Sequence, residues 1–417
     1  MVPDLKPLAV CIIVENMSVP QDTRVWREAV TLAEAGYSVS VVCPKQPGSQ
    51  RSRETLNGIE IYRHSVLEAS TVLGYIAEYG WALVAEFLLT IRIFARTRFR
   101  ILQACNPPDT IFLIALFFKL FGVRFVFDQH DPLPEFFEAR FQRKGLLYAA
   151  LLLTERLTFQ ASHATLVTNA SCREIAISRG RVPPERCFIV RNCPSLNDFS
   201  LQPPNFELKQ KKKYLILYVG VMGSQDGLDL LLESAAYVVK ARGRSDVCFV
   251  LIGAGPEVSK MKTLVSELGL DECVRFTGAL YGNDLRAYLA VADIGVAPDP
   301  SNIFNDKLTM IKILEYMACG LPVVLYDLPE GRRSAKNAAL YAVPNNPRDF
   351  GEKILTLLNS EPLRRHLGEN GQQRIREELN WESEKEKLLQ AYQTAVGTSS
   401  PSQTGPATNS ATSPQIG

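Results

Sequence analysis

Short apolar runs alternate with amphipathic helical patterns along this chain, and the alternation occurs twice. In the first half, residues 8–14 form a continuous apolar run, and Asp22 can cap a helix in which Val25, Ala29 and Leu32 recur at helical spacing. Continuous apolar runs are typical of parallel strands that are buried on both faces. The pattern predicts a doubly wound α/β fold, in which ligands bind outside the carboxyl ends of the strands.

The alternation pauses near residues 192–197 and restarts after an exposed, Pro- and Lys-rich connection within 202–213. Further strands are predicted at 38–43, 59–62, 101–104, 123–128, 164–168 and 188–190 before the pause, and at 215–219, 248–252, 274–277, 294–297 and 323–326 after it.

Two comparable α/β halves predict two Rossmann-like domains that face a cleft, which is a favoured place for a ligand. The boundaries that we expect are 1–195 for the N-terminal domain and 196–380 for the C-terminal domain. A charged amphipathic helix follows at 381–396. The segment 397–417 is rich in Ser, Thr, Pro and Gly, carries no charge and is predicted to be disordered.

Bulk properties fit a soluble globular enzyme of two or three domains, with 417 residues, 46% hydrophobic and 22% charged residues. A net charge of +2 gives no indication of a nucleic-acid partner. The 9 cysteines include no C-x-x-C pair, which fits reduced thiols. Residues 8–14 are too short for a secretory signal, and 109–127 is interrupted by Lys119, Gly122 and Arg124, so helix and strand are expected there. The cytoplasm is the expected compartment.

The segment 312–324 combines a helix pattern that carries a cation and an anion with a glycine stop and a buried strand. Lys312 and Glu315 are three residues apart and therefore share a helix face. A bound sugar nucleotide needs a cation for its diphosphate and an acceptor for its ribose hydroxyls. The alternative is an ordinary surface ion pair on a crossover helix.

This segment resembles the donor-site signature of family 4 retaining glycosyltransferases, which have the GT-B fold. The resemblance extends over roughly residues 8–396 and implies that Glu315 binds the donor ribose. A second segment, which contains Arg275 and Phe276, is similar to the one that lies beside the base in this family. The resemblance also implies that the helix 381–396 crosses back onto the first domain.

A histidine follows the predicted strand 123–128 directly and stands beside carboxylates. His130 and Asp131 would lie at the carboxyl end of the strand, where doubly wound domains carry out chemistry. Neighbouring carboxylates can set the tautomer of the histidine and raise its pKa. The alternative is a histidine that satisfies a loop carbonyl. His130 resembles the cleft histidine of the family, which lies near the reacting sugar.

A glycine-rich turn that contains Gly220 and Gly223 lies between a strand and a helix of the second half. Such a turn lets backbone N–H groups approach an anion, although it can also be a mere tight connection. The family usually places an arginine and a lysine here for the diphosphate. Met222 and Asp226 stand at those positions, so another residue must supply the cation.

The family's pair of glutamates is also incomplete, because Lys307 stands where the first one is expected and Asp306 precedes it. Lys307 and Lys312 are therefore the expected cations for the diphosphate. The alternative is a pair of solvated lysines on helices.

Two segments bear on the acceptor. Residues 20–28 resemble the opening loop and helix of bacterial members that act on surface polysaccharides, and Arg24 or Arg27 would face the cleft there or lie on the helix surface. Residues 79–99 mix large apolar side chains with arginines, which suits either contact with an anionic membrane or a helix that faces the core.

The sequence thus predicts a transferase that moves a sugar from a nucleotide-sugar donor to a hydroxyl of a glycan or lipid-linked acceptor, at the inner face of the membrane or free in the cytoplasm. Retention of the anomeric configuration is implied by the resemblance alone. No Asp-x-Asp motif stands in a suitable loop, so neither a metal nor another cofactor is expected. Two alternatives remain open, namely a GT-B sugar-nucleotide epimerase and a catalytically degenerate partner subunit.

Overall fold

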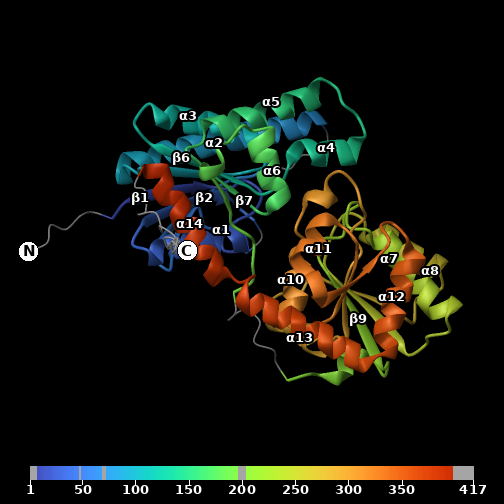
Figure 1. Cartoon of the computed structure of the whole chain (residues 1–417). Coiled ribbons are helices and arrows are strands. Elements are labelled where there is room, and N and C mark those ends of the chain that lie inside the picture. The colour runs from blue at the N-terminus through green and yellow to red at the C-terminus, as the bar shows by residue number, and fades with distance from the viewer. Residues whose placement is uncertain (1–6, 47, 68–71, 196–202, 398–417) are drawn as a thin grey trace, which may run out of the picture.

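The computed structural model describes residues 7–46, 48–67, 72–195 and 203–397, and it contains two α/β units, each built on one sheet (Figure 1). Two expectations concern residues outside these ranges: the tail 397–417, apart from Gly397, and the first part of the connection between the halves, 196–202.

The first sheet has eight strands in the order β3-β4-β2-β1-β5-β6-β7-β8, all paired in parallel except β3 with β4. Its central strand β1 is buried along its whole length, as its uninterrupted apolar sequence predicts. The strands are β1 (Ala9–Ile13), β2 (Ser38–Pro44), β3 (Arg53–Leu56), β4 (Ile59–His64), β5 (Ile101–Cys105), β6 (Arg124–Gln129), β7 (Ala164–Val167) and β8 (Cys187–Ile189).

Helices cover both faces of this sheet (Figure 1). Ile93, Phe118 and Phe159 contribute to the core on the face that α2, α3 and α5 cover, whereas α1 lies on the other face. Asp22 caps α1 by accepting a 3.0 Å hydrogen bond from the backbone N–H of Val25. The helices are α1 (Thr23–Glu34), α2 (Val72–Thr97), α3 (Phe112–Lys119), α4 (Leu133–Phe141), α5 (Leu146–Ala161) and α6 (Ala170–Ser178).

The second sheet has six parallel strands in the order β11-β10-β9-β12-β13-β14. Its strands are β9 (Tyr214–Val219), β10 (Val247–Ile252), β11 (Val274–Gly278), β12 (Ile294–Ala297), β13 (Val323–Tyr326) and β14 (Ala339–Ala342). Its helices are α7 (Leu228–Ala236), α8 (Val258–Glu267), α9 (Gly282–Val291), α10 (Ile311–Ala318), α11 (Pro329–Ala335), α12 (Pro347–Asn359) and α13 (Glu361–Glu377).

The last helix, α14 (Trp381–Val396), leaves the second unit and packs on the first, beside α1 (Figure 1). Trp381 Nε1 donates a 3.0 Å hydrogen bond to Thr31 Oγ1, and the rings of Tyr37 and Tyr392 are 5.9 Å apart. Leu388 and Ala391 are fully buried in the same core. The chain therefore passes between its two units a second time.

The twelve strands that the apolar runs predict are all present, and α/β architecture with two doubly wound units is confirmed. Strands β3 and β14 were not predicted. β3 contains three polar residues and one apolar residue, and β14 begins and ends with alanine, which is depleted in strands. β3 forms a hairpin with β4 around Asn57 and Gly58, which both adopt positive φ. Among the helices that the structure describes, none has the length and apolar character that crossing a membrane requires.

Candidate active site

His130 lies directly beyond the carboxyl end of β6, and a buried carboxylate of that strand holds its ring. His130 Nε2 donates a 2.7 Å hydrogen bond to Asp128 Oδ2, and its backbone N–H donates to Asn106 Oδ1 at 2.7 Å. The His130 side chain is 15% exposed, whereas that of Asp128 is fully buried. Burial opposes the charged imidazole, but Asp128 outweighs burial and raises the pKa of His130.

Arg24 also fixes the position of Asp128. Its Nε and Nη2 atoms donate to the two carboxylate oxygens at 3.0 and 2.6 Å, and Nη1 donates to the carbonyl of Val190 at 2.7 Å. Burial alone would raise the pKa of Asp128, but Arg24 and His130 hold it well below its usual range. Arg24 is 3% exposed, so the alternative of a surface arginine at this position is wrong.

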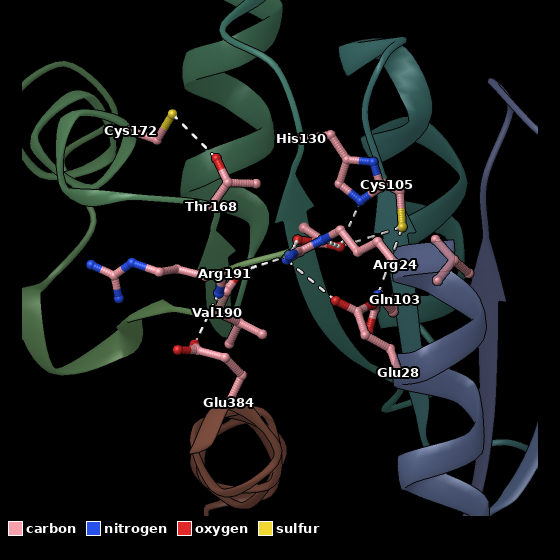
Figure 2. Close-up of polar contacts among 12 residues, drawn as sticks. Arg24, Glu28, Gln103, Cys105, His130, Thr168, Cys172, Val190, Arg191 and Glu384 are labelled. Atoms are coloured by element: carbon pink, nitrogen blue, oxygen red, sulfur yellow. Dashed lines mark hydrogen bonds and ion pairs between the residues drawn. The ribbon is translucent and has the colours of Figure 1, made fainter. Parts of the chain in front are cut away.

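The same network continues to the last helix of the chain. Glu28 lies 3.3 Å from the Arg24 guanidinium and accepts a 2.7 Å hydrogen bond from Gln103 Nε2, while Tyr392 of α14 donates to Gln103 Oε1. Glu384 of α14 also accepts a 2.9 Å hydrogen bond from the backbone of Arg191 (Figure 2). The position of α14 is therefore coupled to the groups that hold His130.

A cavity of about 340 Å³ opens between the two units beside this network. His130 and Asp131 line it together, and burial raises the pKa of Asp131. The first unit also contributes Met17, Gln21, Asp22, Thr23, Arg24, Thr168 and Asn192, and the second contributes Leu308, Thr309 and Ile311.

The glycine-rich turn after β9 lies close to the turn after β10. A Cβ on Gly253 would be 1.8 Å from the carbonyl oxygen of Gly220, so this approach requires glycine. The backbone N–H of Gly223 donates to Asp226 Oδ2 at 2.8 Å. Met222 is fully buried in the core, so an apolar residue is suited to this position, where the family resemblance leads one to expect a cation.

Lys312 is engaged within the second unit. Its ammonium pairs with Asp299 at 2.8 Å, lies 4.8 Å from the centre of the Tyr218 ring and leaves the side chain only 10% exposed. Burial opposes its charge, but Asp299 and Asp226 raise the pKa of Lys312. Lys312 and Glu315 do share α10, yet the ion pair that the structure shows for Lys312 is with Asp299.

Lys307 lies where the two units meet. Its backbone carbonyl accepts a 2.8 Å hydrogen bond from Asn169 Nδ2 at the start of α6, and nearby Ser171 donates to Glu330 at 2.6 Å. Within the described residues, the Lys307 ammonium forms no ion pair. Of the two lysines predicted for the diphosphate, Lys307 is the one that remains available.

Arg275 and Phe276 are placed on the edge strand β11. Arg275 donates to the carbonyl of Leu208 at 3.1 Å and to the hydroxyl of Tyr288 at 3.0 Å. Phe276 packs against the core of the second unit. The contacts of Arg275 thus tie β11 to its neighbours, and neither residue lines the cavity between the units.

Two family models match the chain, and between them they cover both units. Residues 21–193 match the Glycosyl transferase 4-like domain, and residues 203–374 match the Glycosyl transferases group 1. The chain belongs to the family 4 glycosyltransferases of the GT-B fold. This family membership agrees with the fold and with the cavity between the two units.

Individual relatives of this GT-B chain are distant. An uncharacterized glycosyltransferase of Methanocaldococcus jannaschii is 31% identical over 40% of the chain and 44% of its own length. The matched parts span about half the length of such curated relatives. The solved sucrose-phosphate synthase of Thermosynechococcus elongatus has a TM-score of 0.76 at 18% identity, over 94% of the chain and 100% of that protein. Anabaena HepE in complex with UDP-glucose has a TM-score of 0.70 at 13% identity, over 93% and 100%.

The ionisation of Glu28 makes the stability of the folded protein depend on pH. Burial, followed by the charge of Asp128, raises the pKa of Glu28 from 4.5 to about 8. Between these values the folded state retains a proton that the unfolded state has released, so stability falls as the pH rises, by up to about 1.4 kcal/mol per pH unit. The free energy of unfolding of Glu28→Gln, measured by chemical denaturation at several pH values between 5 and 8, should therefore fall less steeply with pH. The difference from the unmodified protein should correspond to one proton.

A matched control is Glu382→Gln, which changes a glutamate whose side chain is 53% exposed. Its slope should equal that of the unmodified protein. A residual slope is expected in Glu28→Gln because burial also raises the pKa of Asp109 to about 8. If Glu28→Gln and the unmodified protein show the same slope, Glu28 is ionised in the folded protein.

Proposed function

We propose that the protein transfers a glycosyl group from a nucleotide-sugar donor to a hydroxyl acceptor. The observation that carries this proposal is the cavity that His130 of the first unit shares with the segment just before α10 of the second. α10 bears Glu315, and the resemblance to the family assigns the donor ribose to this residue. Donor and acceptor would thus meet between the two units, with His130 beside the sugar.

The donor site of this proposal uses few cations. The N-terminus of α10 and the ammonium of Lys307 would stabilise the departing diphosphate, without a metal or another cofactor. Three backbone N–H groups of the turn 220–223 already donate to Ile252, Ala254 and Asp226, so they are not assigned to the diphosphate. Structural neighbours of the same fold have been solved with UDP or UDP-sugars, which supports UDP-sugars as the first donors to test. We further propose retention of the anomeric configuration, on the family resemblance.

The direct test of this function is an assay for release of the nucleoside diphosphate from a panel of UDP-, GDP- and ADP-sugars, with and without hydroxyl acceptors. Release that depends on an acceptor supports the transferase. Conversion of the sugar without any acceptor would instead indicate a sugar-nucleotide epimerase. A folded protein that turns over none of the panel, alone or with a second subunit, would contradict the proposal.

Substitution of Glu315 should affect the donor far more than the fold. The side chain is only half-buried on α10, so its removal exposes no core. A carboxylate that accepts hydrogen bonds from ribose hydroxyls contributes about 1.5–3 kcal/mol, or roughly 10- to 150-fold in Kd. Calorimetry of Glu315→Ala with the best nucleotide should show this loss at an unchanged melting temperature. Unchanged affinity would contradict the assignment of the ribose site.

The acceptor that we propose is lipid-linked and is reached at a membrane surface on the cytoplasmic side. α2 and α3 are in direct contact through Phe87 and Phe117, whose rings are 5.0 Å apart, and α3 packs against α5 (Figure 1). Basic side chains accompany them, such as Arg92, Arg143 and Lys144, which are exposed. Exposed large apolar residues cluster on and next to these helices: Trp81, Val84, Leu88, Ile91, Leu113, Leu116, Phe117, Leu120, Phe121, Leu146, Leu147, Leu153 and Leu157.

Vesicle sedimentation tests this surface. The unmodified protein should sediment with vesicles that contain an anionic phospholipid, because apolar side chains and basic groups both favour such a surface. Leu120 and Phe121 are 81% and 58% exposed, so Leu120→Ser with Phe121→Ser should weaken sedimentation without unfolding the protein. Tyr281→Ser, at an 80% exposed position of the second unit, is the control. Equal sedimentation of both variants would exclude this surface.

A further inference from the structure

One histidine and two glutamates form a buried cluster in the first unit, apart from the groups that hold His130. Glu15 lies two residues beyond β1, His64 ends β4, and Glu86 belongs to α2. His64 Nε2 is 3.1 Å from Glu15 Oε2 and 4.0 Å from Glu86 Oε1. The side chains of His64, Glu15 and Glu86 are 4%, 6% and 1% exposed, and their ligand atoms all lie within 4.8 Å of one another.

The tautomer of His64 follows from its other ring nitrogen. Nδ1 lies 3.2 Å from the carbonyl oxygen of Ser65, which can only accept, so Nδ1 carries the proton. Trp81 Nε1 donates to the same carbonyl at 3.1 Å and helps to fix it. In the neutral ring, Nε2 therefore presents a lone pair to the carboxylate oxygens. An N–H donated to a backbone carbonyl is also the usual outer contact of a metal-bound histidine.

With both glutamates ionised, the facing atoms of the cluster have no hydrogen-bond partner among the described residues. These atoms are Nε2 of His64, Oε2 of Glu15 and both carboxylate oxygens of Glu86. The 3.1 Å contact between His64 and Glu15 is thus close without the geometry of a hydrogen bond. Arg63 is adjacent in sequence, but it pairs with Glu54 at 2.6 Å. Buried and unpaired polar groups of this kind are costly, and they require a partner.

The charges indicate which partner fits. If both glutamates are ionised, the cluster carries a charge of −2, and a protonated His64 would neutralise only half of it and would lose its lone pair. A divalent cation neutralises both carboxylates and accepts the lone pair of Nε2. Ligand atoms of a tetrahedral zinc site lie about 3.3 Å apart, because the bonds are about 2.0–2.2 Å long. The distances of 3.1 and 4.0 Å in the cluster bracket this value.

We propose that Glu15, His64 and Glu86 bind one divalent transition metal ion of the class that prefers imidazole and carboxylate ligands, with Zn²⁺ and Mn²⁺ as its leading members. The ion would connect β1, β4 and α2. It would also fix the start of the loop that carries Met17 into the wall of the cavity. The site is separate from the donor diphosphate, so it does not alter the proposal of a metal-independent transfer.

The test uses the full chain, stripped with a chelator and then titrated with ZnCl₂ or MnCl₂. We expect one bound equivalent by elemental analysis and a higher melting temperature in the presence of the metal. Glu86→Gln keeps the size of the side chain but removes a charged ligand, and it should weaken binding by more than about tenfold. His366→Ala, which removes a histidine that makes an exposed contact with Asn370, is the control for adventitious binding.

Equal affinity in Glu86→Gln and the unmodified protein, or no stoichiometric metal in the unmodified protein, would overturn the proposal. In that case a proton held by Glu86 accounts for the cluster, since burial and Glu15 raise the pKa of Glu86 well above its usual value. If Glu86→Gln does not fold, the unmodified protein decides by its CoCl₂ complex. Intense visible absorption of four-coordinate Co²⁺, or one bound equivalent of Co²⁺ by elemental analysis, supports the site, and the absence of bound Co²⁺ contradicts it.

Discussion

Replacing His130 with alanine should lower the transfer rate by about 10²–10⁴ while leaving the affinity for nucleoside diphosphate nearly unchanged. His130 belongs to the first unit and lines the cavity, whereas the residues proposed to hold the nucleotide belong to the second. Because His130 is proposed to lie beside the transferring sugar, its loss should destabilise the transition state without weakening the binding of the nucleoside diphosphate. Turnover and calorimetric affinity must therefore be measured on the same preparation.

His366→Ala supplies the control for this substitution, because it removes a histidine from α13 in the second unit. It should transfer sugar at the unmodified rate. A variant with parallel losses of affinity and turnover would indicate a folding defect. If His130→Ala transfers sugar at the rate of the unmodified protein, His130 is structural and another group of the first unit must face the sugar.

Asp128→Asn should destabilise the protein by about 3–5 kcal/mol, because the buried guanidinium of Arg24 then loses the carboxylate that accepts two of its hydrogen bonds. The two side chains are 3% and 0% exposed, so solvent cannot replace the lost partner. The pKa of Asp128 is held below its usual range, so its contribution to stability is present above about pH 4 and is lost in acid. Chemical denaturation at pH 7 measures the loss.

The double variant Arg24→Met with Asp128→Asn shows how much the two side chains stabilise each other. Removing both charges should cost less than the sum of the two single substitutions, because neither charge is then left unpaired. Additive losses would show that the two side chains do not stabilise each other. The pH profile of transfer should also shift in Asp128→Asn, since Asp128 raises the pKa of His130.

The fold was predictable because strand and helix patterns are local. The apolar runs that form β1, β5 and β9 need no knowledge of their neighbours to be recognised. The position of His130 after β6 was predictable for the same reason. β3 escaped prediction because its residues are mostly polar, and β14 because alanine has a low preference for strands. Both form because they pair with a neighbouring strand.

The contacts of the site were much less predictable, because residues far apart in the sequence make them. Arg24 and Asp128 are separated by 104 positions, and Gln103 and Tyr392 by 289. Shared helix spacing suggested Lys312 and Glu315 as partners, but Asp299, beyond the end of β12, supplies the carboxylate that Lys312 contacts. The two members of each pair come close together only in the folded protein.

A crystal structure of the protein with bound UDP would show directly whether the nucleotide binds where we propose. We expect the diphosphate near the turn 220–223 and beside Lys307, and the ribose within hydrogen-bonding distance of the Glu315 carboxylate. The side of the diphosphate that the second unit does not contact should face His130 across the cavity. UDP bound to the first unit alone, or in the second unit without contact to Glu315, would contradict the proposed donor site.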